Sequence, residues 1–181
     1  SAVISADKMN VVYRGVDNPM TISIPGITND RIKVSAPGLR KVKGSKYIMS
    51  PPKSRTVTIR ASATLPDGKP VSSSLVFRVK DIPAPSAVIR GKTGVTTLSK
   101  SEIEVSTISG KLIDFDFDID LKTVSFKIKI PGQSVMTVKG NKFNKRAKSA
   151  LGRSRSGQTI TIFDVVVSNP KNTAYKFKNS L

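Results

Sequence analysis

Apolar and polar residues alternate in short runs along the first half of the chain, and turn-forming residues separate these runs. In the clearest run, Val57, Ile59 and Ala61 alternate with polar side chains, which predicts a strand with one buried face. Pro66-Asp67-Gly68 then predicts a tight turn into another strand. The same reasoning predicts strands at residues 2–8, 10–13, 20–24, 31–35, 46–49, 56–64 and 73–80. This density of short strands and turns predicts an immunoglobulin-like β-sandwich over residues 1–84.

A proline-rich stretch marks the predicted boundary between two domains. Ile82-Pro83-Ala84-Pro85 contains two prolines, which stiffen the chain and cannot donate to a continuing strand ladder. We therefore expect a break near residue 84 and a second, mostly β domain over residues 85–181. Its strands are predicted at residues 86–90, 102–106, 113–119, 124–130, 159–167 and 175–177. The whole chain is thus predicted to be mainly β.

The strongest alternation lies in the second domain. Between residues 113 and 119, Ile and Phe side chains face one way, and the other face carries Asp114, Asp116, Asp118 and then Asp120. In the run that follows, Lys127 and Lys129 are opposed by an apolar side made of Val124, Phe126, Ile128 and Ile130. An acidic strand followed by a basic strand predicts a hairpin with cross-strand charge pairs, in which a one-residue slip would bury charges.

One segment has helical periodicity. Residues 141–151 place Phe143, Ala147 and Leu151 on one face, with Asn141 as a candidate cap at the start and Gly152 as a candidate end. This predicted helix is basic.

Residues 11–26 form the most informative segment of the chain. Gly15 and Asp17-Asn18-Pro19 predict a turn between two strands, because Gly tolerates positive φ, Asn and Asp bond their own backbone, and Pro fixes φ. We expect Tyr13 and Asn18 to hold the sandwich together rather than to contact a ligand.

Three segments carry a resemblance to a known family. Tyr13-Arg14-Gly15-Val16-Asp17-Asn18-Pro19 resembles the opening signature of the C-terminal periplasmic region of the GldM/PorM family. Phe77-Arg78-Val79-Lys80-Asp81-Ile82-Pro83 with Pro85 resembles that family's inter-domain segment, and Asp114-Phe115-Asp116-Phe117-Asp118 resembles the long strand of its last domain. The three occur in the family's order and span much of the chain.

This resemblance implies a function and a set of partners. It implies a protein of type IX secretion and gliding motility, anchored in the inner membrane by a helix upstream of this fragment. The fragment would be the outer end of a periplasmic, homodimeric shaft that couples the inner-membrane motor to the outer-membrane-associated ring. The expected partners are a second copy, the ring proteins and, through other parts of the protein, the motor subunit. No cofactor and no small-molecule substrate is implied.

The amino-acid composition limits the alternatives. The chain has no Cys, His or Trp, so thiol chemistry and the commonest general base are excluded, and no Gly-x-Ser-x-Gly motif surrounds a serine. We expect no enzyme activity.

Two other classes are also tested by the sequence. It contains no run of about 18 apolar residues and no leader of basic and then apolar residues, so we expect neither a membrane span nor a precursor. A carbohydrate-binding module or β-sandwich adhesin is a further class. Such proteins usually have an exposed platform of aromatic side chains, and this chain has three Tyr and no Trp from which one could be built.

The net charge of +19 raises the alternative of a basic nucleic-acid-binding β module. The excess is spread almost evenly, with 14 basic and 5 acidic residues up to residue 84 and 17 and 7 after it. Nucleic-acid modules more often concentrate charge beside stacking aromatic residues or on a reading helix. No nucleic acid is therefore expected as the partner, and retention on heparin with salt-dependent binding of duplex DNA would distinguish this class.

Two groups of charged residues are candidate sites. Calcium would suit the four aspartates by charge, but same-face side chains on a strand lie roughly 6 to 7 Å apart and point in parallel. We expect a solvated or lysine-paired face and no metal site. The second group is an acid-free cluster around the predicted helix: Lys139, Lys142, Lys145, Arg146, Lys148, Arg153 and Arg155. It is interpreted as a solvated surface, as a docking surface for an acidic protein partner, or as a nucleic-acid site. Arg40, Lys41, Lys43 and Lys46 form a lesser basic loop, interpreted in the same way.

Overall fold

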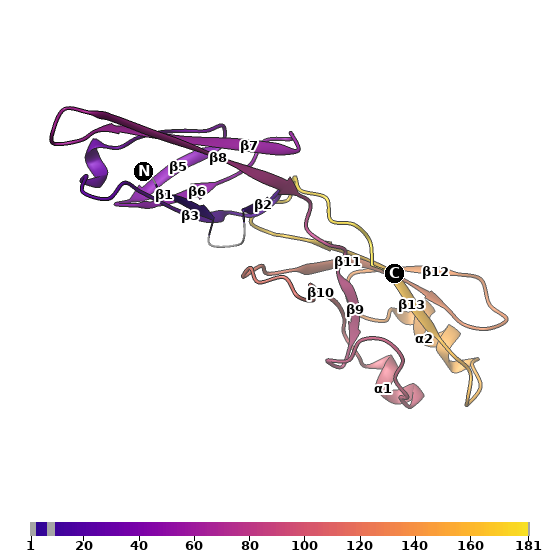
Figure 1. Ribbon diagram of the computed structural model, residues 1–181. Coiled ribbons are helices and arrows are strands. Elements are labelled where there is room, and N and C mark those ends of the chain that lie inside the picture. Colours follow the sequence, from indigo (N-terminus) through magenta and orange to yellow (C-terminus); the bar gives the residue numbers. More distant parts are fainter. Residues whose placement is uncertain (1–2, 7–9, 181) are drawn as a thin grey trace. The chain divides into compact units, whose positions relative to one another are not determined.

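The computed structural model describes residues 3–6 and 10–180. The chain divides into two compact units, Ser1–Ile82 and Pro83–Leu181. Both are built mainly from β-strands (Figure 1). The mainly β class predicted from the sequence is confirmed.

The first unit consists of two four-stranded sheets. One has the order β1-β3-β6-β5, with β1 at Val3–Ala6, β3 at Asn18–Ser23, β6 at Lys46–Met49 and β5 at Leu39–Lys43. The other has the order β2-β8-β7-β4, with β2 at Val11–Tyr13, β8 at Pro70–Lys80, β7 at Thr56–Thr64 and β4 at Lys33–Ser35. All the described pairings in this unit are antiparallel except that of β2 with β8, which is parallel. This strand order is that of an immunoglobulin-like sandwich, as predicted.

The core of the first unit lies between its two sheets. Ile59 and Phe77 come from one sheet and Met20, Ile22 and Met49 from the other, and each is at most 1% exposed. Burying one such side chain contributes about 1.5 to 3 kcal/mol. The strand predicted at residues 56–64 is confirmed with the same bounds, and its alternation places Val57, Ile59 and Ala61 in the core.

The turn within residues 11–26 is confirmed, but the strands that it joins belong to different sheets. β2 pairs with β8, whereas β3 pairs with β1 and β6. The side chain of Asn18, 2% exposed, joins the layers. Its Oδ1 accepts from the backbone N of Tyr13 at 2.8 Å, and its Nδ2 donates to the carbonyls of Tyr13, Val16 and Met49 at 2.9, 3.1 and 3.0 Å. The expectation that Tyr13 and Asn18 hold the sandwich together is confirmed.

The basic residues 40–46 were predicted to form a loop, and this prediction is wrong. Arg40, Lys41 and Lys43 lie on β5, the outer strand of its sheet, and Lys46 lies on the neighbouring β6. Four of the five β5 residues are exposed, so the strand lacks the alternation by which it could have been predicted. Cationic side chains on an outer strand discourage edge-to-edge association with other basic sheets.

The start of β4 also differs from the prediction. A 3₁₀ turn at Asn29–Arg31 precedes this strand, which begins two residues later than predicted.

The second unit combines a two-stranded and a three-stranded sheet. β9 (Ser86–Ile89) pairs with β10 (Ile108–Lys111), and β11 (Lys122–Lys129) lies between β12 (Met136–Lys139) and β13 (Thr161–Ser168). Two short helices are added, α1 (Lys100–Glu104) and α2 (Lys145–Gly152), neither of which is long or apolar enough to cross a membrane. Within the described residues its core includes Ile108, Phe126, Val138, Ala147, Leu151 and Val165, each at most 1% exposed.

The predicted aspartate strand and its hairpin are wrong. Residues 112–121 belong to none of the described strands, and β11 pairs with β12 and β13 on its two sides. Alternation alone specifies the two faces of a segment, but a strand also needs neighbours for its backbone groups. Val124 was predicted on the apolar face of its strand, but its side chain is 48% exposed. The pairing of β11 with β13 shifts register between Thr123 and Ser125, and this irregularity turns Val124 away from the buried face.

Three other predictions in the second unit need correction. Residues 102–106 were predicted as a strand, but α1 occupies most of them because Ser99 and Glu102 form a capping box. The predicted helix begins at Lys145 and is capped by Asn144 instead of Asn141. Residues 175–177 form no strand, although the backbone of Ser180 does pair with Asp164 and Val165 of β13.

Candidate functional site

The seven clustered cations are centred on α2, which is amphipathic. Ala147, Ala150 and Leu151 are buried on one side of the helix. The 3.6-residue repeat places Lys145 opposite this side and Arg146 and Lys148 on its two flanks, and all three are exposed. Asn144 fixes the start of the helix, because its Oδ1 accepts from the backbone N of Ala147 at 2.8 Å. The small apolar face therefore anchors the helix and directs the cations to solvent.

The other four cations flank the helix in sequence. Lys139 ends β12, and Lys142 forms an isolated bridge with Thr107. Arg153 caps the C-terminus of α2, and its Nη2 donates to Oε1 of Gln133 at 3.1 Å, while Nε2 of Gln133 donates to the carbonyl of Ala150 at 2.9 Å. We call the set of seven the α2 basic surface: Lys139, Lys142, Lys145, Arg146, Lys148, Arg153 and Arg155. All seven side chains are exposed, and none forms an ion pair with any residue in 3–6 or 10–180.

The charge at the start of α2 is unfavourable for the helix itself. The first turn contains Lys145 and Arg146 and no acidic residue. Because a helix N-terminus carries partial positive charge, cations there cost a few tenths of a kcal/mol, whereas carboxylates would stabilise it. These residues therefore do not serve helix stability, and they strengthen the positive potential of the surface.

Sequence reasoning missed a cation and a carboxylate that come from α1. Lys100 Nζ donates to the carbonyl of Gly152 at 3.3 Å, which joins α1 to the end of α2. Glu102 Oε2 accepts from the backbone N of Ser99 at 2.8 Å and from its hydroxyl at 2.9 Å. These bonds lower the pKa of Glu102, so its carboxylate is ionised at neutral pH and is held in its own helix cap. The Ser99-to-Glu102 spacing was the available sequence signal for this helix.

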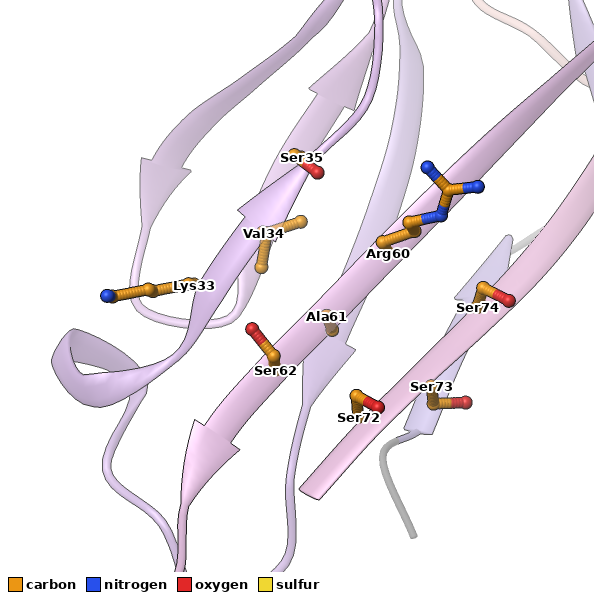
Figure 2. A pocket seen from close by; sticks show the side chains of 9 residues that line it. All are labelled: Lys33, Val34, Ser35, Arg60, Ala61, Ser62, Ser72, Ser73 and Ser74. Carbon is orange, nitrogen blue, oxygen red and sulfur yellow. The ribbon is translucent and has the colours of Figure 1, made fainter. Parts of the chain in front are cut away.

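A shallow depression of about 550 Å³ lies on the outer face of β4, β7 and β8 in the first unit (Figure 2). Its polar lining is Lys33, Ser35, Arg60, Ser62, Ser72, Ser73 and Ser74. Figure 2 shows the hydroxyls spread over neighbouring strands instead of converging on one point. It has no carboxylate in its lining, and the chain has no His or Cys. The depression therefore lacks a carboxylate, imidazole or thiolate to activate a serine.

The four aspartates of residues 114–120 do not form a metal-binding cluster in the described part of the chain. Asp114, Asp116, Asp118 and Asp120 are exposed along residues 112–121, an irregular segment. Across the described part of the chain, no group of three or more Asp or Glu side chains could hold a metal ion.

Comparison with known families assigns both units. A model described as the GldM third domain matches residues 1–80, and a model described as the GldM C-terminal domain matches residues 83–180. A search of curated proteins found no match. The two family models follow one another along almost the full chain, in the same order as the two units of the structure. The chain therefore belongs to the GldM family of the gliding and type IX secretion machinery and comprises its third and C-terminal domains.

Proposed function

We propose that this chain is a periplasmic shaft segment that couples the inner-membrane motor to the outer-membrane-associated ring through protein–protein contacts. The consecutive match to two GldM domains is the observation on which this rests. In this role the chain is a homodimer and catalyses no reaction. A sandwich with a buried apolar core suits mechanical coupling, because protein interiors are nearly incompressible and transmit strain.

The α2 basic surface is the proposed contact with an acidic surface on the ring. Seven exposed cations that form no ion pair with any described residue favour this assignment. Complementary charge accelerates association and fixes the orientation of the complex more than it adds affinity. The contact is therefore expected to weaken as the salt concentration rises.

Charge reversal provides the test. The triple substitution K145E/R146E/K148E should weaken the pull-down of ring proteins by at least about tenfold, which corresponds to about 1.4 kcal/mol. The fold should survive, because Glu at positions 145 and 146 lies in the first helical turn, where a carboxylate is favourable. The expected thermal midpoint is equal to or slightly above that of the wild type.

The matched control is K171E/K176E/K178E, which reverses three exposed lysines of the same unit outside the α2 basic surface. This control should retain most ring binding. Equal retention by both triple variants would contradict the assignment of the surface. Steeply salt-dependent binding of duplex DNA, lost in the α2 variant, would instead favour the nucleic-acid alternative.

A further inference from the structure

The first unit has an open sheet edge along part of β8. This strand extends from Pro70 to Lys80, but its neighbour β2 pairs only with Arg78–Lys80. On its other side β8 pairs with β7 from Pro70 to Arg78 without a shift in register. β1 belongs to the other sheet and forms no ladder with β8. None of the described strands therefore pairs with the outer side of residues 70–77, which we call the β8 edge.

Hydrogen bonds near the end of β8 show which backbone groups face this outer side. The backbone N of Val79 donates to the carbonyl of Arg55 at 2.8 Å, on the side of β7. The backbone N of Arg78 donates the opposite way, to the carbonyl of Asn10 at 3.1 Å, on the side of β2. Backbone groups alternate between the two sides of a strand. The residues of the β8 edge whose N–H and C=O groups point away from β7 are therefore Ser72, Ser74 and Val76.

The β8 edge lacks the protection that is common on outer strands. Charged side chains ordinarily discourage pairing at a free edge, and β5, the outer strand of the other sheet, carries exposed cations. Residues 70–77, in contrast, contain no charged residue. Val76 is 54% exposed and adds apolar surface there. The edge is thus suited to receive an added strand.

The charge beside the edge defines the partner. Arg60 of β7 is paired with Ser74, so the two side chains share one face of the sheet. Arg60 and Lys33 line the depression of about 550 Å³ together with small serines, and the lining contains no carboxylate (Figure 2). Neither cation forms an ion pair with any described residue.

An added strand would bring a side chain within reach of Arg60. A residue facing Ser74 on that strand would lie two strands away from Arg60, a separation of about 10 Å between backbones. The small side chain of Ser74 leaves the space between them open, so a long acidic side chain and the Arg60 guanidinium can meet above it. A Glu at this position would give the cation the carboxylate that the depression lacks.

We propose that the β8 edge is a docking site for an extended segment of an acidic partner protein, which adds as a strand beside β8 with a Glu facing Ser74. Its main chain bonds the outward groups of Ser72, Ser74 and Val76, and its Glu pairs with Arg60. In such strand addition, main-chain bonds supply affinity and alternate side chains supply specificity. A second copy is a poorer occupant of this edge, because the chain has 14 basic and 5 acidic residues up to residue 84. The site lies in the other unit from α2 and does not depend on the ring contact proposed there.

The test titrates the full chain at neutral pH with a capped nine-residue peptide of alternating Val and Glu, and follows single amides by NMR. Binding should slow hydrogen exchange at Ser72, Ser74 and Val76 by at least about tenfold. The amides of Ser73 and Leu75 face β7 and should change little. A peptide of alternating Val and Lys should bind more weakly, because Arg60 repels it.

Two variants separate the backbone contribution from the charge contribution. Ser74→Pro removes an N–H that does not bond β7, a position where a strand tolerates proline, and should weaken peptide binding by at least about tenfold. Arg60→Glu leaves the edge backbone unchanged and should weaken binding of the Glu peptide about 3- to 10-fold while strengthening that of the Lys peptide. The control Lys43→Glu makes the same change of charge on the other sheet and should alter affinity less than about twofold.

Several results would overturn the proposal. They are the absence of saturable binding, equal affinities of Arg60→Glu and Lys43→Glu for the Glu peptide, and slow exchange at Ser72, Ser74 and Val76 before any peptide is added. If Ser74→Pro loses its fold, the comparison of the two Glu variants decides alone. If raising the concentration of the chain protects these amides and sedimentation shows a larger species, a second copy occupies the edge and the acidic-strand proposal is wrong.

Discussion

Replacing Gly38 by alanine should destabilise the first unit by about 3 kcal/mol or more. Gly38 lies in the turn before β5 with φ of +77°, a conformation that alanine adopts only with strain. An added Cβ would lie 2.0 Å from the carbonyl oxygen of Ser50. That oxygen cannot retreat freely, because the backbone N of Ser50 donates to the Gly38 carbonyl at 2.9 Å. Urea unfolding followed by circular dichroism measures the change.

Gly26 is the matched control for this substitution. Its φ of +80° is nearly the same, but an added Cβ would meet nothing within 4 Å. Gly26→Ala therefore tests the backbone strain alone, which is worth about 1 to 2 kcal/mol. If Gly38→Ala were no more destabilising than Gly26→Ala, the close approach of the β5 turn to Ser50 would be contradicted.

The second large effect is expected at Asn18. Asn18→Ala should reduce the free energy of unfolding by about 3 to 5 kcal/mol, because one buried amide makes four hydrogen bonds and buried polar groups left without a partner cost about 1 to 3 kcal/mol each. The loss should appear in the same unfolding measurement. It should also increase hydrogen exchange in β2 and β3, the strands on either side of the turn.

A second Asn18 variant separates hydrogen bonding from packing. Asn18→Asp keeps the side-chain shape and the acceptor for the Tyr13 N–H, but it loses the three donated bonds and buries a carboxylate. It should be at least as destabilising as alanine at neutral pH. Asn144→Ala, which removes a helix cap with one observed bond, should cost only about 1 kcal/mol. Asn18 variants that cost no more than this cap would contradict the role assigned to the amide.

Local sequence signals predicted the fold wherever pattern and pairing agreed. The strand at residues 56–64 was predicted with its correct bounds for two reasons. Its apolar side chains alternate with polar ones and are buried, and its backbone pairs with a strand on each side, β8 and β4. β5 was missed because an outer strand exposes most of its residues and leaves no alternation. Residues 113–119 failed in the opposite way, since they have the alternating pattern of a strand but belong to none of the strands that the structure describes.

Two helices could not be predicted correctly from the sequence because each segment had two interpretations. For α2 two residues could cap the helix, and for α1 the segment could be a strand or a capped helix. Asn141 and Asn144 both precede the helix, and only the structure shows that Oδ1 of Asn144 accepts the bond. Residues 102–106 alternate well enough to resemble a strand, but the Ser99 and Glu102 cap favours a helix. In both segments a local cap, and not the order of apolar and polar residues, decides where the helix begins.

The candidate site was predictable in composition but not in geometry. The sequence alone identified the acid-free cluster between residues 139 and 155, and all seven side chains are exposed. The sequence did not indicate that Lys100 would reach the end of α2 or that Gln133 would hold Arg153. Both contacts join segments at least 20 residues apart, and local patterns carry no information about such contacts.

Site-specific crosslinking in cells tests the central claim, that α2 contacts the outer-membrane-associated ring. A photoreactive amino acid placed at position 148 of the full-length protein should crosslink to a ring protein, and the same group at position 176 should not. Lys148 and Lys176 are both exposed and lie in the same unit, so the comparison controls for general proximity to the ring. Crosslinks from position 148 alone would support the coupling role. Equal crosslinking from both positions, or none from position 148 in cells with an assembled ring, would contradict it.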